Sequence, residues 1–385
     1  MKHTLNVALI GTGFIGKQHI EAIRRIPYTH IAAVADCNES SLQKTCEDIG
    51  IAHGYTDYHE MLEKEQIDVV HNCTPSAMHY AIDKDIIACG KHVYCEKPLT
   101  LRSEESAELV RLAEEKGVAT GANFNYRNNA MVREMRERVQ NGEAGKPLLV
   151  HGSYLQDWLM FDTDYDWRMD PKLGGASRAL SDIGSHCFDT IQFILGERIV
   201  AVNASILTVY PTRKRTEQSG TFSASGGKVI DQFHVENEDA AFVIAKFESG
   251  LQGFFNISQV CGGKKNALSV NVSGSKESLE WNQEQSDRLL IGKRQTGNEE
   301  LFVGEAYLTG AVKRFATLPN GHPVGWADAF RNGIQSFYES IWDGSYKTGD
   351  PHAFKWYSDF KNAHYIMKIV EACLESGKTG TWVNV

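Results

Sequence analysis

Three polar residues near the middle of the chain have the spacing of one helix face. Asp182, His186 and Asp189 stand at positions i, i+4 and i+7, and apolar residues between them occupy other parts of the helix surface. Histidine suits general acid and base catalysis because its unperturbed pKa lies near ~6.5, and a neighbouring carboxylate fixes its tautomer. The triplet therefore indicates a proton-handling site, with a helix that has an ordinary polar face as the alternative interpretation.

A glycine-rich turn near the N-terminus indicates dinucleotide binding. The turn comprises Gly11, Thr12, Gly13, Phe14, Ile15 and Gly16. It follows an apolar run typical of a strand and precedes a pattern typical of a helix, which is the context that a Gly-x-Gly-x-x-Gly motif requires. Gly11 permits the tight turn, Gly13 lets the backbone approach a pyrophosphate, and Gly16 allows the helix to pack closely on the strand. A plain glycine-rich turn is the alternative.

The first carboxylate after this motif indicates which dinucleotide binds. Asp36 closes the second predicted strand about 20 residues after Gly16, where a carboxylate accepts the ribose hydroxyls of the adenosine half. Its charge would repel a 2′-phosphate, and the next residues, Cys37 and Asn38, provide no cation for one. We therefore expect NAD rather than NADP, the alternative for Asp36 being a solvated carboxylate at a strand end.

The elements that position these residues follow from two hydrophobic periods. The first third of the chain alternates short β-like runs with longer helical patterns, which is typical of a parallel α/β sheet. The predicted strands are 5–10, 31–35, 69–73, 92–95 and 119–123. The predicted helices between them are 15–25, 41–49, 77–88 and 103–115. This pattern predicts an N-terminal Rossmann domain with a doubly wound parallel sheet, in which His71 and His92 lie inside strands and are packed, hydrogen-bonded histidines.

The remainder of the chain is dominated by short strands. We expect strands at 148–154, 200–209, 240–247, 250–257, 267–273 and 288–291, and the short connections between the later ones favour antiparallel pairing. A loop is expected at 211–227, and helices at 325–341 and 352–375 follow. The expected fold is thus α/β with two domains. Residues 1–126 form the NAD-binding Rossmann domain, and residues 127–385 form a substrate-binding and oligomerisation α/β domain with a large, mostly antiparallel open sheet.

Composition and charge exclude several classes of protein. The 385 residues are 42% hydrophobic and carry a net charge of -9, which fits two globular domains and argues against nucleic acid or an anionic membrane as partner. No apolar stretch approaches the ~20 residues that span a bilayer, and no signal-peptide pattern appears, so we expect a cytoplasmic protein. The eight cysteines form no C-x-x-C pair, and no comparable metal-ligand spacing occurs, so neither disulfides nor a metal are expected.

Further motifs, in order along the chain, resemble those of the Gfo/Idh/MocA oxidoreductases. They are Thr74-Pro75 with His79 after the fourth strand, Cys95-Glu96-Lys97-Pro98 after the fifth, Asn125-Tyr126-Arg127 at the domain junction, and the helical segment from Asp182 to Asp189. The resemblance covers essentially the whole chain. It implies an NAD-dependent oxidoreductase that forms a homodimer or homotetramer through the outer face of the second domain's sheet.

The resemblance also implies roles for individual residues. Lys97 would lie beside the reacting hydroxyl and stabilise a developing alkoxide, while His186 would take the proton and Asp182 would hold a neighbouring hydroxyl. Arg127 and Asp189 would bind the substrate or order the site. The residues implied to flank the cofactor are Thr74, Pro75, His79, Glu96, Lys97, Trp167 and Arg168.

The substrate class is indicated by a smaller group of residues. The stretches 154–158, 167–168 and 174–178 resemble a subgroup of sugar dehydrogenases that includes levoglucosan dehydrogenase, although Ala176 departs from the commoner Gly-Gly-Gly. Polyols are held by polar side chains and an aromatic face, so a pocket with Trp158 on one side is expected. The candidate substrate-binding residues here are Tyr154, Gln156, Asp157 and His322.

These observations favour hydride transfer between NAD and a ring hydroxyl of a sugar, anhydrosugar or cyclitol. An inositol 2-dehydrogenase-type enzyme is the alternative within the same chemistry. A non-catalytic NAD-binding regulatory protein is the alternative of another class. The joint presence of Lys97, Asp182 and His186 argues against a regulator, because a sensor does not need groups that handle a proton.

Overall fold

The computed structural model of the protein describes residues 2–220, 227–347 and 354–385. The chain divides into two compact units. The N-terminal unit comprises Met1–Asn128 and Ala327–Tyr365, and the second unit comprises Asn129–Trp326 and Ile366–Val385. The units thus differ from the division expected at residue 126, because a segment close to the C-terminus packs with the N-terminal unit.

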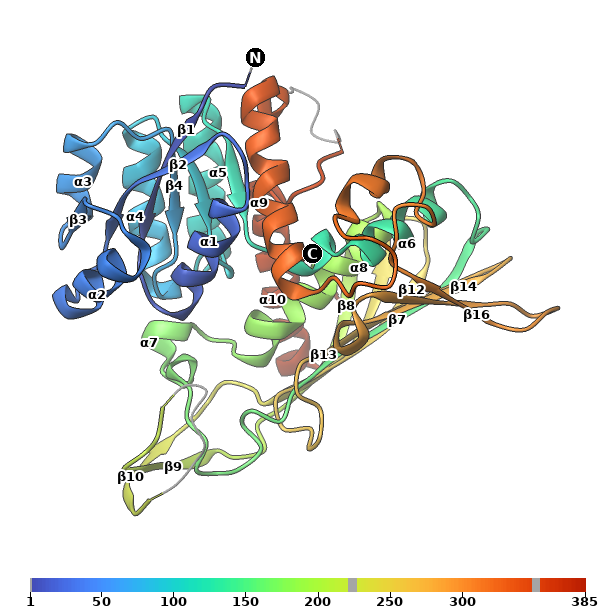
Figure 1. Cartoon of the computed structure of the whole chain (residues 1–385). Helices are drawn as coiled ribbons and strands as arrows, with labels where there is room; N and C mark the ends of the chain where they lie inside the picture. The colour runs from blue at the N-terminus through green and yellow to red at the C-terminus, as the bar shows by residue number, and fades with distance from the viewer. Residues whose placement is uncertain (1, 221–226, 348–353) are drawn as a thin grey trace. The chain divides into compact units, whose positions relative to one another are not determined.

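A six-stranded parallel sheet forms the centre of the N-terminal unit (Figure 1). Its strands are β1 (Leu5–Ile10), β2 (Thr29–Ala35), β3 (Gly54–Tyr55), β4 (Val69–Asn72), β5 (His92–Cys95) and β6 (Thr120–Ala122). The connecting helices are α1 (Phe14–Arg24), α2 (Glu39–Ile49), α3 (Tyr58–Lys64), α4 (Ser76–Ala88) and α5 (Ser103–Lys116). Helices cover both faces, and every residue of β4 is buried, as a parallel sheet requires.

The order of the strands confirms the predicted Rossmann fold. The order is β3-β2-β1-β4-β5-β6, so the chain reverses its direction of progress across the sheet between β1 and β4. In open parallel sheets, ligands bind at the carboxyl ends of the strands at this reversal point. The loops after β1 and β4 flank this reversal point, so the cofactor is expected there.

Hydrogen bonds and ion pairs attach the late segment to the N-terminal unit. The segment includes most of α9 (Trp326–Asp343), which corresponds to the helix predicted at 325–341. Arg25 forms an ion pair of 2.5 Å with Asp328, and the Tyr338 hydroxyl lies 2.7 Å from His71 Nε2. The backbone N–H of Ala122 donates to the carbonyl oxygen of Ser358 at 2.8 Å. The last helix, α10 (Phe360–Thr379), begins later than predicted, and the predicted start at 352 lies outside the described residues.

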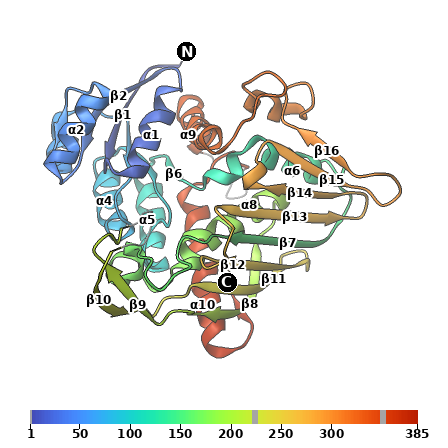
Figure 2. The same ribbon diagram turned by 60° about the horizontal axis from the view of Figure 1, so that its bottom comes forward.

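The second unit contains a nine-stranded mixed sheet, and Figure 2 shows its central strands side by side. In spatial order the strands are β16 (Glu299–Phe302), β15 (Arg288–Gly292), β14 (Ser278–Asn282), β13 (Ala267–Gly274), β7 (Pro147–Leu155), β12 (Gln252–Ser258), β11 (Ala240–Phe247), β8 (Ile199–Leu207) and β17 (Val383–Asn384). Only β7 and β12 pair in parallel, and the other neighbours are antiparallel. The predicted large, mostly antiparallel sheet is therefore confirmed.

A separate hairpin interrupts the segment that the sequence predicts as a loop. Within 211–227, residues Thr212–Thr216 form β9, which pairs with β10 (Val229–His234) in antiparallel register. Residues 221–226 of the predicted loop lie outside the described residues. All five residues of β9 are Thr, Arg or Lys, so hydrophobic periodicity alone does not reveal this strand.

Helices pack on one face of the large sheet. α6 (Ala130–Gln140) packs against β14 and β15, and α8 (Ser185–Leu195) packs against β7 and β13. The Phe188 ring on α8 meets the Phe255 ring on β12 edge to face at 5.5 Å. At Gly152 on β7 the absent side chain leaves room for the Cys187 sulfur. The helix that carries the predicted proton-handling residues is thus held close to the sheet.

The opposite face of the sheet is exposed within this chain. Residues of β11 alternate between buried and exposed, and Phe242 and Ile244 are 49% and 46% exposed. Phe254 on the neighbouring β12 is also 49% exposed. Large apolar side chains therefore stand next to one another on this face. Among the residues that the structure describes, no helix has the length and apolarity needed to cross a membrane.

We expect Gly152→Ala to destabilise the second unit. An added Cβ would lie 2.7 Å from the Cys187 sulfur and 3.1 Å from a Phe255 ring carbon, so α8 or the sheet must shift. Overpacking of this kind costs about 1–3 kcal/mol, which urea unfolding measures directly. The matched control is Gly297→Ala, because Gly297 is exposed and its Cβ would meet no atom within 4 Å. An equal loss of stability in both variants would contradict this account.

Candidate active site

The glycine-rich turn between β1 and α1 has the geometry of a phosphate cradle. Gly11 has a φ of +93°, and a Cβ there would lie 2.7 Å from the carbonyl oxygen of Cys73. A Cβ at Gly16 would overlap the carbonyl oxygen of Gly11, whereas a Cβ at Gly13 would meet nothing within 4 Å. The first and third glycines are thus required by the backbone, and the second leaves an open surface at the helix N-terminus. These features fit the pyrophosphate of a dinucleotide.

Asp36 stabilises this turn from the end of β2. One carboxylate oxygen, Oδ2, accepts hydrogen bonds from the backbone N–H and the hydroxyl of Thr12 at 2.8 and 2.7 Å. The other, Oδ1, accepts from the backbone N–H of Asn38 at 2.9 Å. Thr12 is fully buried, whereas Phe14 is 64% exposed and Ile15 lies between these extremes. The predicted ribose-binding carboxylate therefore also holds the glycine turn.

The turn after β4 is tied to the segment after β5 by a buried histidine. Both ring nitrogens of His79 face carbonyl oxygens, with Nε2 2.8 Å from Thr74 and Nδ1 2.8 Å from Pro98. The Thr74 hydroxyl donates to Asn72 Oδ1 at 2.7 Å, and the Asn72 amide donates to Asp83. Burial raises the pKa of Asp83 to about 7. Pro75 is exposed and stands directly before α4.

The segment after β5 contains a buried carboxylate next to the predicted active lysine. Glu96 Oε1 lies 2.9 Å from His19 Nε2 and accepts a hydrogen bond of 2.5 Å from the Asn123 amide. Glu96 Oε2 accepts the backbone N–H of Lys97 at 3.1 Å. Lys97 itself is partly exposed. Arg127 is buried in a 3₁₀ turn, Asn125–Asn128, at the end of the first segment of the unit.

The three residues predicted to handle a proton lie in the second unit, on a helical segment that begins with a wider turn. The segment Leu180–Gly184 is a π-helical turn that contains Asp182, and α8 follows it and contains His186 and Asp189. The three side chains are 8%, 5% and 0% exposed. The sequence predicts a regular helix here. The π turn is the difference, and such turns occur frequently at functional sites.

Two polar side chains approach the Asp182 carboxylate. The Gln259 amide donates to Oδ2 at 3.1 Å, and Arg168 Nε lies 3.4 Å from Oδ1. Arg168 also stacks over the Trp167 ring at 4.3 Å from its centroid. The structure thus brings the predicted Arg168 and Asp182 together. Sequence reasoning misses Gln259, and the only signal for it is a polar residue placed just after a predicted strand.

A buried glutamate holds the backbone that leads into the π turn. Glu238 Oε1 accepts hydrogen bonds from the Ser177 hydroxyl, the Arg178 N–H and the Leu180 N–H at 2.6, 3.0 and 2.8 Å. Sequence reasoning also misses Glu238, because it belongs to an acidic run that is typical of a solvated surface. Its three donors make it a positioning residue for the segment that carries Asp182.

The candidate substrate-binding residues divide into two groups. The Tyr154 hydroxyl and the Gln156 amide both donate to Asn266 Oδ1, at 2.7 and 2.9 Å, and the Tyr154 ring lies 6.3 Å from the His186 ring. Asp157 instead forms an ion pair of 2.6 Å with Lys265, and the hydrogen bond from Lys265 lowers the pKa of Asp157. His322 is exposed in a turn where its own backbone and ring face the Pro319 carbonyl.

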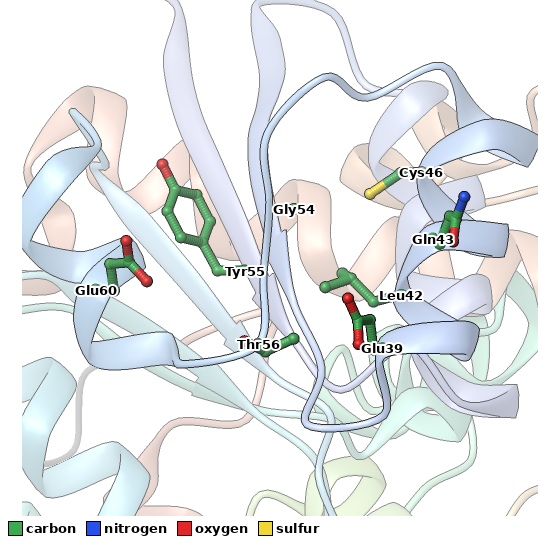
Figure 3. Close-up of a pocket in the computed structure, with 8 residues that line it drawn as sticks. All are labelled: Glu39, Leu42, Gln43, Cys46, Gly54, Tyr55, Thr56 and Glu60. Atoms are coloured by element: carbon green, nitrogen blue, oxygen red, sulfur yellow. The ribbon is translucent and has the colours of Figure 1, made fainter.

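A hollow on the N-terminal unit lies outside these groups (Figure 3). It is bordered by α2, β3 and the start of α3. Its lining residues are Glu39, Leu42, Gln43, Cys46, Gly54, Tyr55, Thr56 and Glu60. None of the site residues predicted from the sequence lines this hollow.

Two family models match this chain. The model described as an oxidoreductase family with an NAD-binding Rossmann fold matches residues 5–124, and the GFO/IDH/MocA C-terminal domain matches residues 132–280. The two matches together span most of the chain. The chain belongs to the GFO/IDH/MocA oxidoreductase family. The predicted family, the predicted fold and the predicted NAD-binding domain are therefore confirmed.

Individual members of the GFO/IDH/MocA family are similar over long stretches. A levoglucosan dehydrogenase of Pseudarthrobacter phenanthrenivorans is 27% identical over 99% of this chain and 98% of its own. A myo-inositol 2-dehydrogenase of Thermotoga maritima is 26% identical over 66% of this chain and 69% of its own. The solved structure of a levoglucosan dehydrogenase in complex with NADH and L-sorbose has a TM-score of 0.87 and is 25% identical, with 100% of this chain and 99% of that chain covered.

We expect Asp36 to determine the choice between NAD and NADP. The wild-type protein should bind NAD more tightly, because the carboxylate would repel a 2′-phosphate. Asp36→Ser should narrow this preference and Asp36→Arg should narrow or reverse it, as measured by equilibrium titration with each cofactor. The control is Asp48→Ser, which removes an exposed carboxylate that pairs with Lys44 at the end of α2. A wild-type preference for NADP would refute this role of Asp36.

Proposed function

We propose that this protein is an NAD-dependent dehydrogenase that interconverts a ring hydroxyl and a ketone on a sugar, anhydrosugar or cyclitol. The observation that carries the proposal is the burial of Asp182 and His186 on one short helical segment. Burial of such polar groups costs free energy, and a protein that only senses its cofactor has no use for them. The full-length similarity to a levoglucosan dehydrogenase supports the substrate class.

The cofactor half of the proposed site belongs to the N-terminal unit. NAD, when bound, supplies the hydride acceptor. The glycine turn from Gly11 to Gly16 would hold its pyrophosphate, and Asp36 would accept the adenosine ribose hydroxyls. Thr74, His79 and Glu96 order the two neighbouring loops through the hydrogen bonds described above.

The remaining chemistry is assigned to side chains of this chain. The Lys97 ammonium donates a hydrogen bond to the reacting oxygen and stabilises its negative charge as the proton leaves. The His186 imidazole accepts that proton at a ring nitrogen, and the Asp182 carboxylate accepts a hydrogen bond from a neighbouring hydroxyl of the substrate. Arg127 and Asp189 order the site from positions that are themselves buried.

The substrate pocket in this proposal is polar. Tyr154 and Gln156 are oriented by their shared acceptor Asn266 and present hydrogen-bonding groups of the kind that polyols require. The similarity to a myo-inositol 2-dehydrogenase favours a cyclitol as the second candidate substrate. The cytoplasm is the proposed compartment, because all eight cysteines are free thiols, which a reducing environment preserves.

The proposed chemistry predicts activity in wild-type protein and its loss in two variants. With NAD and a panel that includes levoglucosan, myo-inositol and D-glucose, NADH absorbance should rise for at least one compound. Lys97→Ala and His186→Ala should fold and bind NAD nearly normally, yet lose about 10²–10⁴-fold in kcat. In wild-type protein the rate should fall on the acid side of the pH profile as the imidazole becomes protonated, and His186→Ala should lack this limb.

Surface residues of the same types provide the controls for these variants. Lys84 and His59 both form ion pairs at the surface of the N-terminal unit, and their alanine variants should keep wild-type turnover. If either Lys97→Ala or His186→Ala retains wild-type turnover while binding NAD, that residue does not handle the proton. NAD binding without turnover of any polyol would favour the regulatory alternative.

We further propose that the exposed face of the large sheet pairs with another copy of the chain to give a homodimer or homotetramer. Phe242, Ile244 and Phe254 form an apolar patch there, and closed symmetric oligomers commonly bury such patches. Phe242→Asp and Ile244→Asp should lower the molar mass measured by light scattering. Leu318→Asp, which changes an exposed leucine in a turn, is the control. A monomeric wild-type protein at working concentration would reject this assembly.

A further inference from the structure

A continuous chain of four buried polar side chains crosses the N-terminal unit and ends beside Lys97. The Tyr338 hydroxyl on α9 lies 2.7 Å from Nε2 of His71 on β4. Nδ1 of His71 lies 2.7 Å from Nδ1 of His19 on α1. Nε2 of His19 lies 2.9 Å from Oε1 of Glu96, which follows β5. Each of the four residues is at most 6% exposed.

One arrangement of protons gives every donor in this chain an acceptor. The Tyr338 hydroxyl donates to Nε2 of His71, which leaves the Nδ1–H of His71 to donate to Nδ1 of His19. The His19 ring then carries its own proton on Nε2 and donates it to Glu96. Both rings are neutral and Glu96 is a carboxylate. If every hydrogen bond ran the other way, from Glu96 to Tyr338, the His71 Nε2–H would donate to the Tyr338 oxygen. The Tyr338 proton would then be buried with no acceptor among the described residues, which is costly.

The surroundings of the chain favour a neutral His71 ring and an ionised Glu96 carboxyl group. The His19 ring meets the Phe330 ring edge to face at 4.9 Å, and the His71 ring lies 5.1 Å from the Tyr94 ring. Burial lowers the pKa of His71 well below its usual value. Burial alone would raise the pKa of Glu96, but hydrogen bonds from His19 and Asn123 and the charge of Lys97 lower it.

The Glu96 carboxylate connects this chain to the proposed active lysine. Its Oε1 faces His19 and Asn123, so its Oε2 is turned toward the backbone N–H of Lys97 at 3.1 Å. Without the two donors on Oε1, the carboxylate would be free to rotate away from Lys97. The orientation of the Lys97 backbone thus depends on the His19 ring, which belongs to a different element, the helix α1 that follows the glycine-rich turn.

We propose that His19 is a positioning residue for Lys97: its Nε2–H holds the Glu96 carboxylate, and that carboxylate holds the backbone N–H of Lys97. The catalytic consequence rests on the proposed role of Lys97 in proton handling. The hydrogen-bond chain itself does not rest on that role. The two parts can therefore be tested separately.

The first test is a measurement on the wild-type protein without substrate. Selective ¹⁵N-labelling of histidine distinguishes protonated from unprotonated ring nitrogens by NMR, and His19→Gln and His71→Gln assign the two rings. The proposal requires a proton on Nε2 and none on Nδ1 of His19, with the reverse for His71. A His19 ring that carries its proton on Nδ1, or on both nitrogens, would overturn it.

The second test uses two variants of His19, each of which retains a polar group at the position of only one of the two ring nitrogens. Gln can place an amide nitrogen near the position of Nε2, and Asn can reach only the position of Nδ1, so His19→Gln keeps a donor to Glu96 and His19→Asn loses it. In His19→Asn the Lys97 amide should exchange with deuterium about tenfold faster. With the substrate found in the panel, its kcat should fall about 10²-fold, the size expected of a misplaced catalytic group, with near wild-type NAD affinity.

Two controls separate positioning from stability. His19→Gln should restore most of the Lys97 amide protection and of the turnover. Tyr338→Phe removes a buried hydrogen bond of the same chain but keeps the His19 ring beside Glu96, so it should lower stability while kcat falls much less than in His19→Asn. If turnover follows thermal stability across all three variants, His19 is only structural and the proposal fails.

The outcomes distinguish this proposal from the proposed function. Full activity in Lys97→Ala would refute the role of Lys97 and leave the effect of His19 on Lys97 amide exchange as a structural result. Loss of activity in Lys97→Ala together with wild-type activity in His19→Asn would refute the positioning proposal alone. When His19→Asn and Lys97→Ala are combined, kcat should fall no further than in Lys97→Ala alone, because His19 acts through Lys97.

Discussion

The carboxylate of Glu96 imposes the constraint on which the N-terminal unit depends. Removing a carboxylate from water costs several kcal/mol unless donors in the protein replace the lost hydration. The donors come from three places: the His19 ring on α1, the Asn123 amide after β6, and the backbone of Lys97. Satisfying one buried charge therefore aligns the glycine-rich helix with the loops at the carboxyl ends of two strands.

In the second unit, two neighbouring acidic residues are also buried and also bind donors from other elements. Glu238 collects donors from the segment before the π turn, while Asp239 pairs with Arg178 and with Arg213, which lies 2.6 Å from it. Burial would raise the pKa of Asp239, but the charges of these two arginines lower it. The backbone that carries Asp182 is thereby attached to the start of β11. In both units, a buried carboxylate thus binds the backbone at or next to a catalytic candidate.

A structural feature can be predicted from the sequence when the residues that form it are close together along the chain. Gly11 and Gly16 could be recognised because their roles are local: a positive φ and a close approach of the helix to its own turn. His71 could be recognised as a packed histidine, but its partner Tyr338 lies 267 residues away. The π turn at Asp182 could not be predicted either, because helical periodicity does not distinguish one wide turn from a regular α-helix.

The sequence by itself determined the family, the Rossmann order of strands and helices, the mostly antiparallel second sheet, and the identity of the residues that carry the proposed chemistry. The order of elements and the second sheet follow from periodicity and glycine geometry, which act over a few residues, whereas the family and the role of Lys97 come from the resemblance of several motifs to those of a known family. Only the tertiary structure decided that Asp157 pairs with Lys265, that a late segment joins the N-terminal unit, and that His19 faces Glu96. Hydrogen bonds and ion pairs form between whichever groups the fold brings together, and nothing in the local sequence specifies a partner that is many residues away.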